Sequence, residues 1–190
     1  MARIGAPMQI TPVDSDFNLF RVEDVFSQDL VQQVLATDWA NLPWHRQEGQ
    51  ESWPRRKIDN SALCWIQDWD SECSCLWPKI GTATGTTMGQ YTGTAFWLDE
   101  PGFTCRMHTD GELPGSMQLT WIGAENLGTT FYWYKNPSSL RYQTPFEPNS
   151  GYIMINQAND QGYRRLMWHA MLNAVPANTF RITSYSVGFK

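Results

Sequence analysis

The sequence has no apolar run long enough to span a membrane, and its first residues, MARIGAPMQI, lack the apolar core and cleavage pattern of a signal peptide. It also lacks internal repeats and low-complexity segments. We therefore expect a cytoplasmic protein that has no membrane partner.

Basic residues are few. The 14 Lys and Arg stand against 19 Asp and Glu, so the formal net charge is −5. The compact basic runs are Arg55-Arg56-Lys57 and Arg164-Arg165, and each is better explained as a solvated edge. Because a surface that binds nucleic-acid phosphates needs clustered Lys and Arg, this balance speaks against a nucleic-acid partner.

Cysteine is scarce too, with four residues at positions 64, 73, 75 and 105. Cys73 and Cys75 have the spacing of half a zinc site, but Cys64 and Cys105 are poorly placed to complete a zinc knuckle. We expect reduced thiols that pack as small buried apolar side chains.

What the chain does have is a globular composition with many aromatic rings. Hydrophobic residues make up 42% and charged residues 17%, with ten Trp, seven Tyr and nine Phe. Rings in such numbers cover sheet faces and line pockets in β-rich proteins. A length of 190 residues predicts one domain over residues 1–190.

Helical spacing of apolar residues is confined to the first part of the chain. Residues 23–37 are predicted to form an amphipathic helix, and residues 65–80 a second helix that ends near Pro78. From residue 86 onward, short extended runs alternate with Gly- and Pro-containing turns, which is typical of a β-sandwich or barrel. We predict a mainly β fold with N-terminal helices (α+β). Residues 1–85 would be a helical and irregular support region, and residues 86–190 the β core.

Seven extended runs are predicted in that core. They lie at residues 86–98, 103–109, 116–123, 129–134, 151–156, 165–172 and 179–189.

Histidine is scarcer still, with three residues at 45, 108 and 169. His108 and Asp110 are two residues apart at the end of an extended run, so both side chains can point to the same face. They would supply two ligands suited to Fe, Mn, Co or Zn. Such a pair often arises by chance, and taken alone it is better explained by a polar strand that runs into a loop.

His169 makes a metal site more convincing, because it lies in the apolar run RLMWHAMLN, where an imidazole without a partner is costly to bury. A hairpin centred near Val175 would set His169 opposite Arg181, with Thr183 next along the same face. Arg181 needs an anion, and no acidic residue lies nearby in sequence. We expect a bound carboxylic acid, unless a distant Asp or Glu pairs with it.

Two His and one carboxylate on one face of an octahedron form the facial triad of non-haem Fe(II) oxygenases. We predict His108, Asp110 and His169 as catalytic metal ligands, and Arg181 and Thr183 as cofactor-binding residues.

The segment 86–190 resembles the double-stranded β-helix (jelly-roll, cupin-like) of the Fe(II)/2-oxoglutarate-dependent dioxygenases, and most of all the prolyl-4-hydroxylase-like branch. The matching landmarks are HTD, LGTTFYWY, SGYIMIN and WHAMLNAVPANTFRITSYS, with Arg181 twelve residues beyond His169. The chain departs from the family pattern at Leu127-Gly128, where members often have paired Gly. It also departs at Trp121, which stands in the region where many members have a Tyr.

The resemblance implies Fe(II) and 2-oxoglutarate as cofactors, O2 as co-substrate, and Arg181 as the clamp on the distal carboxylate of 2-oxoglutarate. Related iron halogenases lack the carboxylate at the position of Asp110, so the resemblance favours hydroxylation over halogenation. The substrate would be a peptide or small molecule, with hydroxylation of a prolyl residue or of a small amino-acid-like compound. Two alternatives stay open: a cupin-like metalloenzyme that does not use 2-oxoglutarate, and a non-catalytic β-sandwich binding module. Three tryptophans, Trp97, Trp121 and Trp133, could shape a substrate pocket, although core packing explains each one alone.

Overall fold

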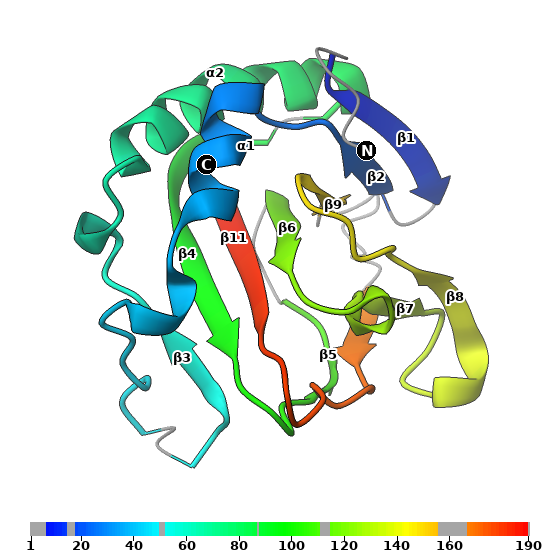
Figure 1. Ribbon diagram of the computed structural model, residues 1–190. Helices are drawn as coiled ribbons and strands as arrows, with labels where there is room; N and C mark the ends of the chain where they lie inside the picture. Colours follow the sequence, from blue (N-terminus) through cyan, green and yellow to red (C-terminus); the bar gives the residue numbers. More distant parts are fainter. Residues whose placement is uncertain are drawn as a thin grey trace.

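Two antiparallel sheets form the body of the molecule (Figure 1). A seven-stranded sheet has the order β1-β2-β9-β6-β11-β4-β3, and a four-stranded sheet has the order β5-β10-β7-β8. The computed structural model describes residues 7–14, 18–49, 52–86, 88–110, 115–155 and 167–189. The predicted mainly β fold with additional helices is confirmed.

The strand bounds are as follows. The large sheet contains β1 Gln9–Asp14, β2 Leu19–Glu23, β3 Arg55–Lys57, β4 Gln90–Asp99, β6 Gly115–Ile122, β9 Ser150–Met154 and β11 Arg181–Phe189. The small sheet contains β5 Cys105–His108, β7 Thr130–Tyr132, β8 Leu140–Gln143 and β10 Trp168–Met171.

Each of the seven predicted extended runs coincides with one strand to within a residue or overlaps it, in the order β4, β5, β6, β7, β9, β10 and β11, whereas β8 was not predicted. The support region differs from its prediction, because residues 1–85 also supply β1, β2 and β3 to the large sheet. The basic run at residues 164–165 lies outside the described residues. Within the described ranges, no helix has the length and apolar character needed to cross a membrane.

The first helix, α1, spans Gln28–Ala36 and begins five residues later than predicted. The backbone N–H of Phe26 donates instead to the side chain of Asn149 at 3.0 Å, and the Asn149 amide donates back to the Phe26 carbonyl at 3.3 Å. Ser27 then caps the helix by accepting from the N–H of Leu30. A partner 123 residues away therefore takes the backbone groups that a longer helix would use.

The second helix, α2, spans Ile66–Thr84 and continues through Pro78, so its predicted end was wrong. Pro78 has no N–H to donate to the carbonyl four residues earlier, a loss that usually ends or kinks a helix. The buried side chains of Trp77 and Ile80 flank it and hold this turn against the sheet. The helix ends where Gly85 adopts a left-handed conformation with φ 67°.

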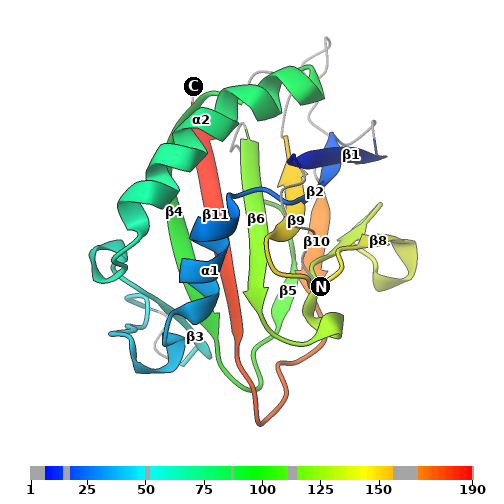
Figure 2. The same ribbon diagram turned by 45° about the horizontal axis from the view of Figure 1, so that its top comes forward.

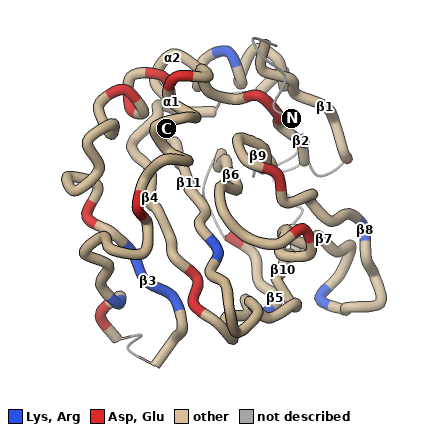
Figure 3. Tube along the Cα trace, in the orientation of Figure 1, with Lys and Arg blue, Asp and Glu red and all other residues tan. Residues whose placement is uncertain are grey.

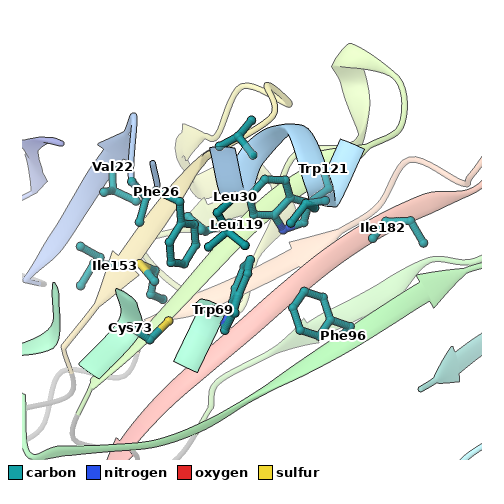
Figure 4. Packing of buried hydrophobic residues seen from close by; sticks show 14 of the residues in the cluster. Val22, Phe26, Leu30, Trp69, Cys73, Phe96, Leu119, Trp121, Ile153 and Ile182 are labelled. Atoms are coloured by element: carbon teal, nitrogen blue, oxygen red, sulfur yellow. The ribbon is translucent and has the colours of Figure 1, made fainter. Parts of the chain in front are cut away.

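Both helices lie on the same face of the large sheet (Figure 2). The main hydrophobic core lies between them and the sheet, and Trp69 of α2 is its centre (Figure 4). The Trp69 ring lies 4.2 Å from that of Phe26 and 4.8 Å from that of Phe96 of β4. Its indole N–H donates to the Thr94 hydroxyl at 2.9 Å. Because this outer face carries the main core, the inner face is available for polar side chains.

Replacing Pro78 by Ala tests whether tertiary burial carries α2 past the proline. We expect the free energy of unfolding to rise by about 1–2 kcal/mol, since Ala restores the missing hydrogen bond and Pro costs about 3 kcal/mol relative to Ala inside a helix. Urea denaturation followed by circular dichroism measures the change. Lys79→Ala, at the neighbouring exposed position, should change it by less than about 0.5 kcal/mol. A loss of stability in Pro78→Ala would mean that the core needs the local geometry that Pro imposes.

Candidate metal centre

Three side chains with metal-ligating atoms meet between β5 and β10. His108 is the last residue of β5, Asp110 follows two residues later, and His169 lies in β10. The strands are antiparallel, with His169 directly opposite His108. Side chains of directly opposed residues lie on the same face, and the two imidazole rings are 4.3 Å apart between centroids.

The ligand atoms of this group converge on one point. The Nε2 atom of His108 lies 3.4 Å from Oδ1 of Asp110, and Nε2 of His169 lies 3.3 Å from the same oxygen. All three ligand atoms lie within 4.8 Å of one another. Ligands about 2.1 Å from a metal on one octahedral face are about 3 Å apart, so this set needs little adjustment to hold an ion.

The other nitrogen of each imidazole is held by a backbone carbonyl. Nδ1 of His108 lies 2.8 Å from the carbonyl oxygen of Arg106, and Nδ1 of His169 lies 3.1 Å from that of Met167. A carbonyl only accepts hydrogen bonds, so Nδ1 carries the proton in both rings. Nε2 is thus the atom of each ring that faces the shared point, where it donates to Asp110 when it carries a proton and would bind a metal ion when it has lost that proton.

Tyr185 of β11 fixes the carboxylate from the opposite sheet. Its hydroxyl donates to Oδ2 of Asp110 at 2.6 Å, which leaves Oδ1 toward the two imidazoles. Tyr185 was not predicted from the sequence as a residue of the site. It lies two positions beyond Thr183 on the same face of the strand, so strand alternation applied for one more step would have found it.

The electrostatics of the group agree with its geometry. The hydrogen bond to Asp110 raises the pKa of His108 to about 10. Burial alone would raise the pKa of Asp110, but hydrogen bonds from His108 and His169 hold it well below its usual range. Burial and the charge of Asp110 raise the pKa of Tyr185, so its hydroxyl remains a donor at neutral pH. Asp110 is therefore ionised, and its carboxylate accepts hydrogen bonds from His108, His169 and Tyr185.

A cavity of about 240 Å³ adjoins the three ligands and reaches into the space between the sheets. Its walls combine guanidinium, hydroxyl and amide groups with apolar side chains. The lining residues are Arg55, Trp97, Cys105, His108, Asp110, Gln118, Thr129, His169, Ala170, Met171, Arg181, Thr183 and Tyr185. All five residues that the sequence analysis assigned to the site line this one cavity.

Arg181 reaches the cavity by a different route from the one predicted. It lies in the large sheet opposite Asp99 of β4, whereas His169 lies in the small sheet, so the predicted cross-strand pair of His169 and Arg181 was wrong. The reason is Val175, the predicted hairpin centre. Val175 is buried, and its backbone N–H donates to the carbonyl of Phe103 at 3.1 Å. The chain therefore crosses here from the small sheet to the large sheet and does not form a hairpin.

Arg181 also has an acidic partner that its sequence neighbourhood does not reveal. Its Nη1 atom donates to Oδ2 of Asp99 at 2.8 Å, and both side chains are almost fully buried. The structure therefore shows the alternative in which a distant acidic residue, Asp99, pairs with Arg181. Within the described part of the chain, the Nε atom of Arg181 is buried and has no hydrogen-bond partner. The guanidinium thus has hydrogen-bonding capacity left for a second anion.

Of the three tryptophans considered for a pocket, Trp97 lines the cavity. Trp121 is buried in the outer core, where its indole N–H donates to Ser184 at 3.0 Å, so it does not stand in for the family's Tyr. Gln118, on the other face of β6, lines the cavity instead and accepts a hydrogen bond from Tyr152 at 2.9 Å. Trp133 is partly exposed and is not among the lining residues.

The four cysteines form no zinc site. All are free, and in the described part of the chain the cluster of metal-ligating side chains is the one at His108. Cys73 is buried as expected, but Cys64 and Cys75 are exposed, so the prediction of buried thiols was wrong for these two. Cys75 lies only two residues from Cys73 on α2 and therefore points away from the sheet.

No family model and no curated protein matches the chain. Solved structures do match over most of its length. A Pseudomonas putida prolyl-4-hydroxylase superposes with a TM-score of 0.61 at 13% identity, covering 92% of this chain and 94% of that one. HygX from Streptomyces hygroscopicus, with nickel and 2-oxoglutarate bound, gives 0.58 at 9% identity and coverages of 90% and 83%. The 2-oxoglutarate-dependent epimerase SnoN from nogalamycin biosynthesis gives 0.59 at 12%, with coverages of 90% and 77%. The chain has the double-stranded β-helix fold of these proteins.

Replacing Tyr185 by Phe removes one hydrogen bond from Asp110 and leaves the three ligands in place. We expect the affinity for Co(II) to fall by about 10- to 100-fold, which is the usual effect of removing a partner of a metal ligand. Anaerobic titration followed by the visible Co(II) bands measures it. Tyr91→Phe is the matched control, since that hydroxyl donates to the carboxylate of Asp70 at 2.6 Å, away from the cavity. Equal affinities in both variants would show that Tyr185 does not position Asp110.

Proposed function

We propose that the protein is an Fe(II)- and 2-oxoglutarate-dependent oxygenase that hydroxylates an unactivated C–H bond. The observation that carries the proposal is the convergence of His108, Asp110 and His169 within 4.8 Å, beside a cavity that contains Arg181. The fold supports it, since the chain superposes on oxygenases of this kind over most of its length.

The donor set suits the metal. Two imidazole nitrogens and one carboxylate oxygen on one side of an ion are the ligands of non-haem Fe(II) oxygenases, and they leave positions open for other ligands. His108, Asp110 and His169 would hold Fe(II). Tyr185 would keep Asp110 a ligand through one oxygen only, because its other oxygen accepts the tyrosine hydroxyl.

Arg181 and Thr183 would hold 2-oxoglutarate. Both are buried on β11 and line the cavity beside the ligands. A buried guanidinium N–H without a partner is costly, and the Nε atom of Arg181 is one. A carboxylate oxygen would satisfy it with a strong, charge-assisted hydrogen bond. Gln118 and Thr129 add polar groups to the same wall.

When bound, Fe(II) with 2-oxoglutarate and O2 supplies the oxidising chemistry that attacks a C–H bond. The chain contributes ligand orientation, a cation for a carboxylate, and the apolar walls of Trp97, Ala170 and Met171, which limit water near the reacting groups. Asp110 as a third ligand favours hydroxylation over halogenation. The fold itself does not fix the outcome, because the epimerase SnoN shares it.

The proposed substrate class comes from the resemblance to prolyl-4-hydroxylases. A prolyl residue of a peptide or a small amino-acid-like molecule is our candidate, and the superposition on a prolyl-4-hydroxylase supports it. The net charge of −5 argues against nucleic acid.

One observation favours a second candidate, a cupin-like metalloenzyme that does not use 2-oxoglutarate. Arg181 already has Asp99 as an ionic partner, so a bound acid is not needed to neutralise its charge. The third hypothesis, a non-catalytic binding module, requires that His108, Asp110 and His169 bind no metal in spite of their convergence. Both alternatives can be distinguished from the leading proposal by one titration.

The test is anaerobic addition of Fe(II) and then 2-oxoglutarate to the protein. We expect a metal-to-ligand charge-transfer band, and succinate release when O2 is admitted, because the keto acid binds the metal directly. His169→Ala should abolish both signals, whereas His45→Ala should leave them unchanged. The backbone of His45 forms an isolated antiparallel β-bridge with Lys57, and His45 is not among the residues lining the cavity.

Fe(II) binding without the band would favour the cupin-like enzyme. Failure of the wild-type protein to bind Fe(II) at all would favour the binding module. Succinate release without an added substrate would establish the reaction class, and a panel of proline peptides and amino acids would then search for the substrate that stimulates it.

A further inference from the structure

Three charged residues form one row across three neighbouring strands of the large sheet. Arg55 of β3 is directly opposite Asp99 of β4, and Asp99 is directly opposite Arg181 of β11. Figure 3 shows basic stretches on β3 and at the start of β11, with an acidic stretch at the end of β4 between them. Side chains in such a row share one face of the sheet, which is here the face of the cavity.

Asp99 accepts hydrogen bonds from both arginines. Arg55 binds it through two nitrogens, with Nε 2.5 Å from Oδ1 and Nη2 3.1 Å from Oδ2. Arg181 binds Oδ2 through Nη1 at 2.8 Å. The Asp99 side chain has no solvent exposure, and those of Arg55 and Arg181 are 16% and 2% exposed. The two cations thus share one buried carboxylate.

The charges of Arg55, Asp99 and Arg181 add up to one net positive charge. With Arg181 alone, Asp99 would cancel the guanidinium charge, and the cavity would offer no net attraction to a carboxylate at that end. Arg55 supplies the second cation and so restores a net charge of about one unit beside the cavity, in surroundings where charges interact more strongly than in water.

Arg55 is well fixed for this role. Its guanidinium carbon lies 4.3 Å from the ring centroid of Phe103, 5.1 Å from that of Trp97 and 5.3 Å from that of Trp53. Aromatic faces stabilise a guanidinium that has lost part of its hydration. Three rings and a bidentate carboxylate therefore hold Arg55 against Asp99.

We infer that Arg55 is a positioning residue for the distal carboxylate of 2-oxoglutarate, and that it acts by neutralising Asp99 so that Arg181 keeps its charge for the ligand. The inference rests on the proposed function. It gives a role to a residue outside the β core in which the sequence analysis placed the site.

The experiment measures dissociation constants on the Ni(II)-loaded protein by calorimetry for two ligands. One is 2-oxoglutarate, and the other is 2-oxopentanoate, which has the same carbon chain without the distal carboxylate. Arg55→Gln should weaken the binding of 2-oxoglutarate by about 10- to 100-fold, because a positive charge is lost. The affinity for 2-oxopentanoate should stay within about twofold of the wild-type value. Arg55→Lys, which keeps the charge, should retain most of the affinity for 2-oxoglutarate.

Adding Asp99→Asn to Arg55→Gln removes the carboxylate that Arg55 neutralised. This double variant should return to within about threefold of the wild-type affinity for 2-oxoglutarate, because Arg181 regains its charge. Because the double variant leaves the buried Arg181 without its ionic partner, Arg55→Gln, which keeps the pair of Arg181 and Asp99, carries the test if the double variant folds poorly. The matched control is Arg56→Gln, which removes a charge one residue away, from a side chain paired with Glu100 at 2.5 Å. It should bind both ligands like the wild type.

Wild-type protein that binds Ni(II) but not 2-oxoglutarate would overturn the proposed function and this inference with it. Normal wild-type binding together with normal binding by Arg55→Gln would overturn the inference alone. Weak binding that Asp99→Asn fails to rescue would also overturn it, because Arg55 would then act by direct contact and not through Asp99.

Discussion

The cross-strand pairing of His108 with His169 is the constraint on which the candidate site depends. The register of β5 and β10 places these residues directly opposite each other, and both rings are fixed by backbone carbonyls at Nδ1. Asp110 needs only two more residues of chain to reach the same point. A shift of one residue in this register would turn one imidazole to the other face and separate the ligands.

The two faces of the large sheet divide stability and function between them. The outer face packs against α1 and α2 through a cluster of aromatic rings around Trp69. The inner face carries buried polar groups such as Arg181, Asp99 and Thr183, which contribute little to a hydrophobic core. Because the outer core supplies the apolar burial, the inner face can hold charges in the positions that a metal and an acid require.

The β core and the convergence of His108, Asp110 and His169 could be predicted because their signals are local. Strand runs after residue 86 alternate with turns, and the two-residue spacing of His108 and Asp110 gives a shared face directly. Strands β1 and β2 were missed because they are short, and because β2, with which β1 pairs, is held in the sheet by β9, about 130 residues away. Trp121 was wrongly placed near the cavity, because the sequence shows that residues alternate along β6 but not which of them face the cavity. Gln118 and not Trp121 turns out to face the cavity.

The surroundings of Arg181 could not be predicted, because they depend on long-range register. Asp99 is 82 residues from Arg181 and 44 from Arg55, and no sequence pattern links the three. The same holds for the route by which Arg181 reaches the cavity, since the buried Val175 replaces the expected hairpin with a crossing between sheets. Side chains that titrate or ligate can thus be identified from sequence, whereas the partners that tune them need the fold.

X-ray absorption at the iron edge of the anaerobic Fe(II)-loaded protein would show which side chains bind the metal. Cys105 makes the test sharp, because its thiol lies 3.6 Å from Nδ1 of His108 at the edge of the same cavity. We predict nitrogen and oxygen ligands at about 2.1 Å from the iron, two of them imidazoles. A sulfur scatterer at about 2.3 Å, or a shell with fewer than two imidazoles, would contradict it.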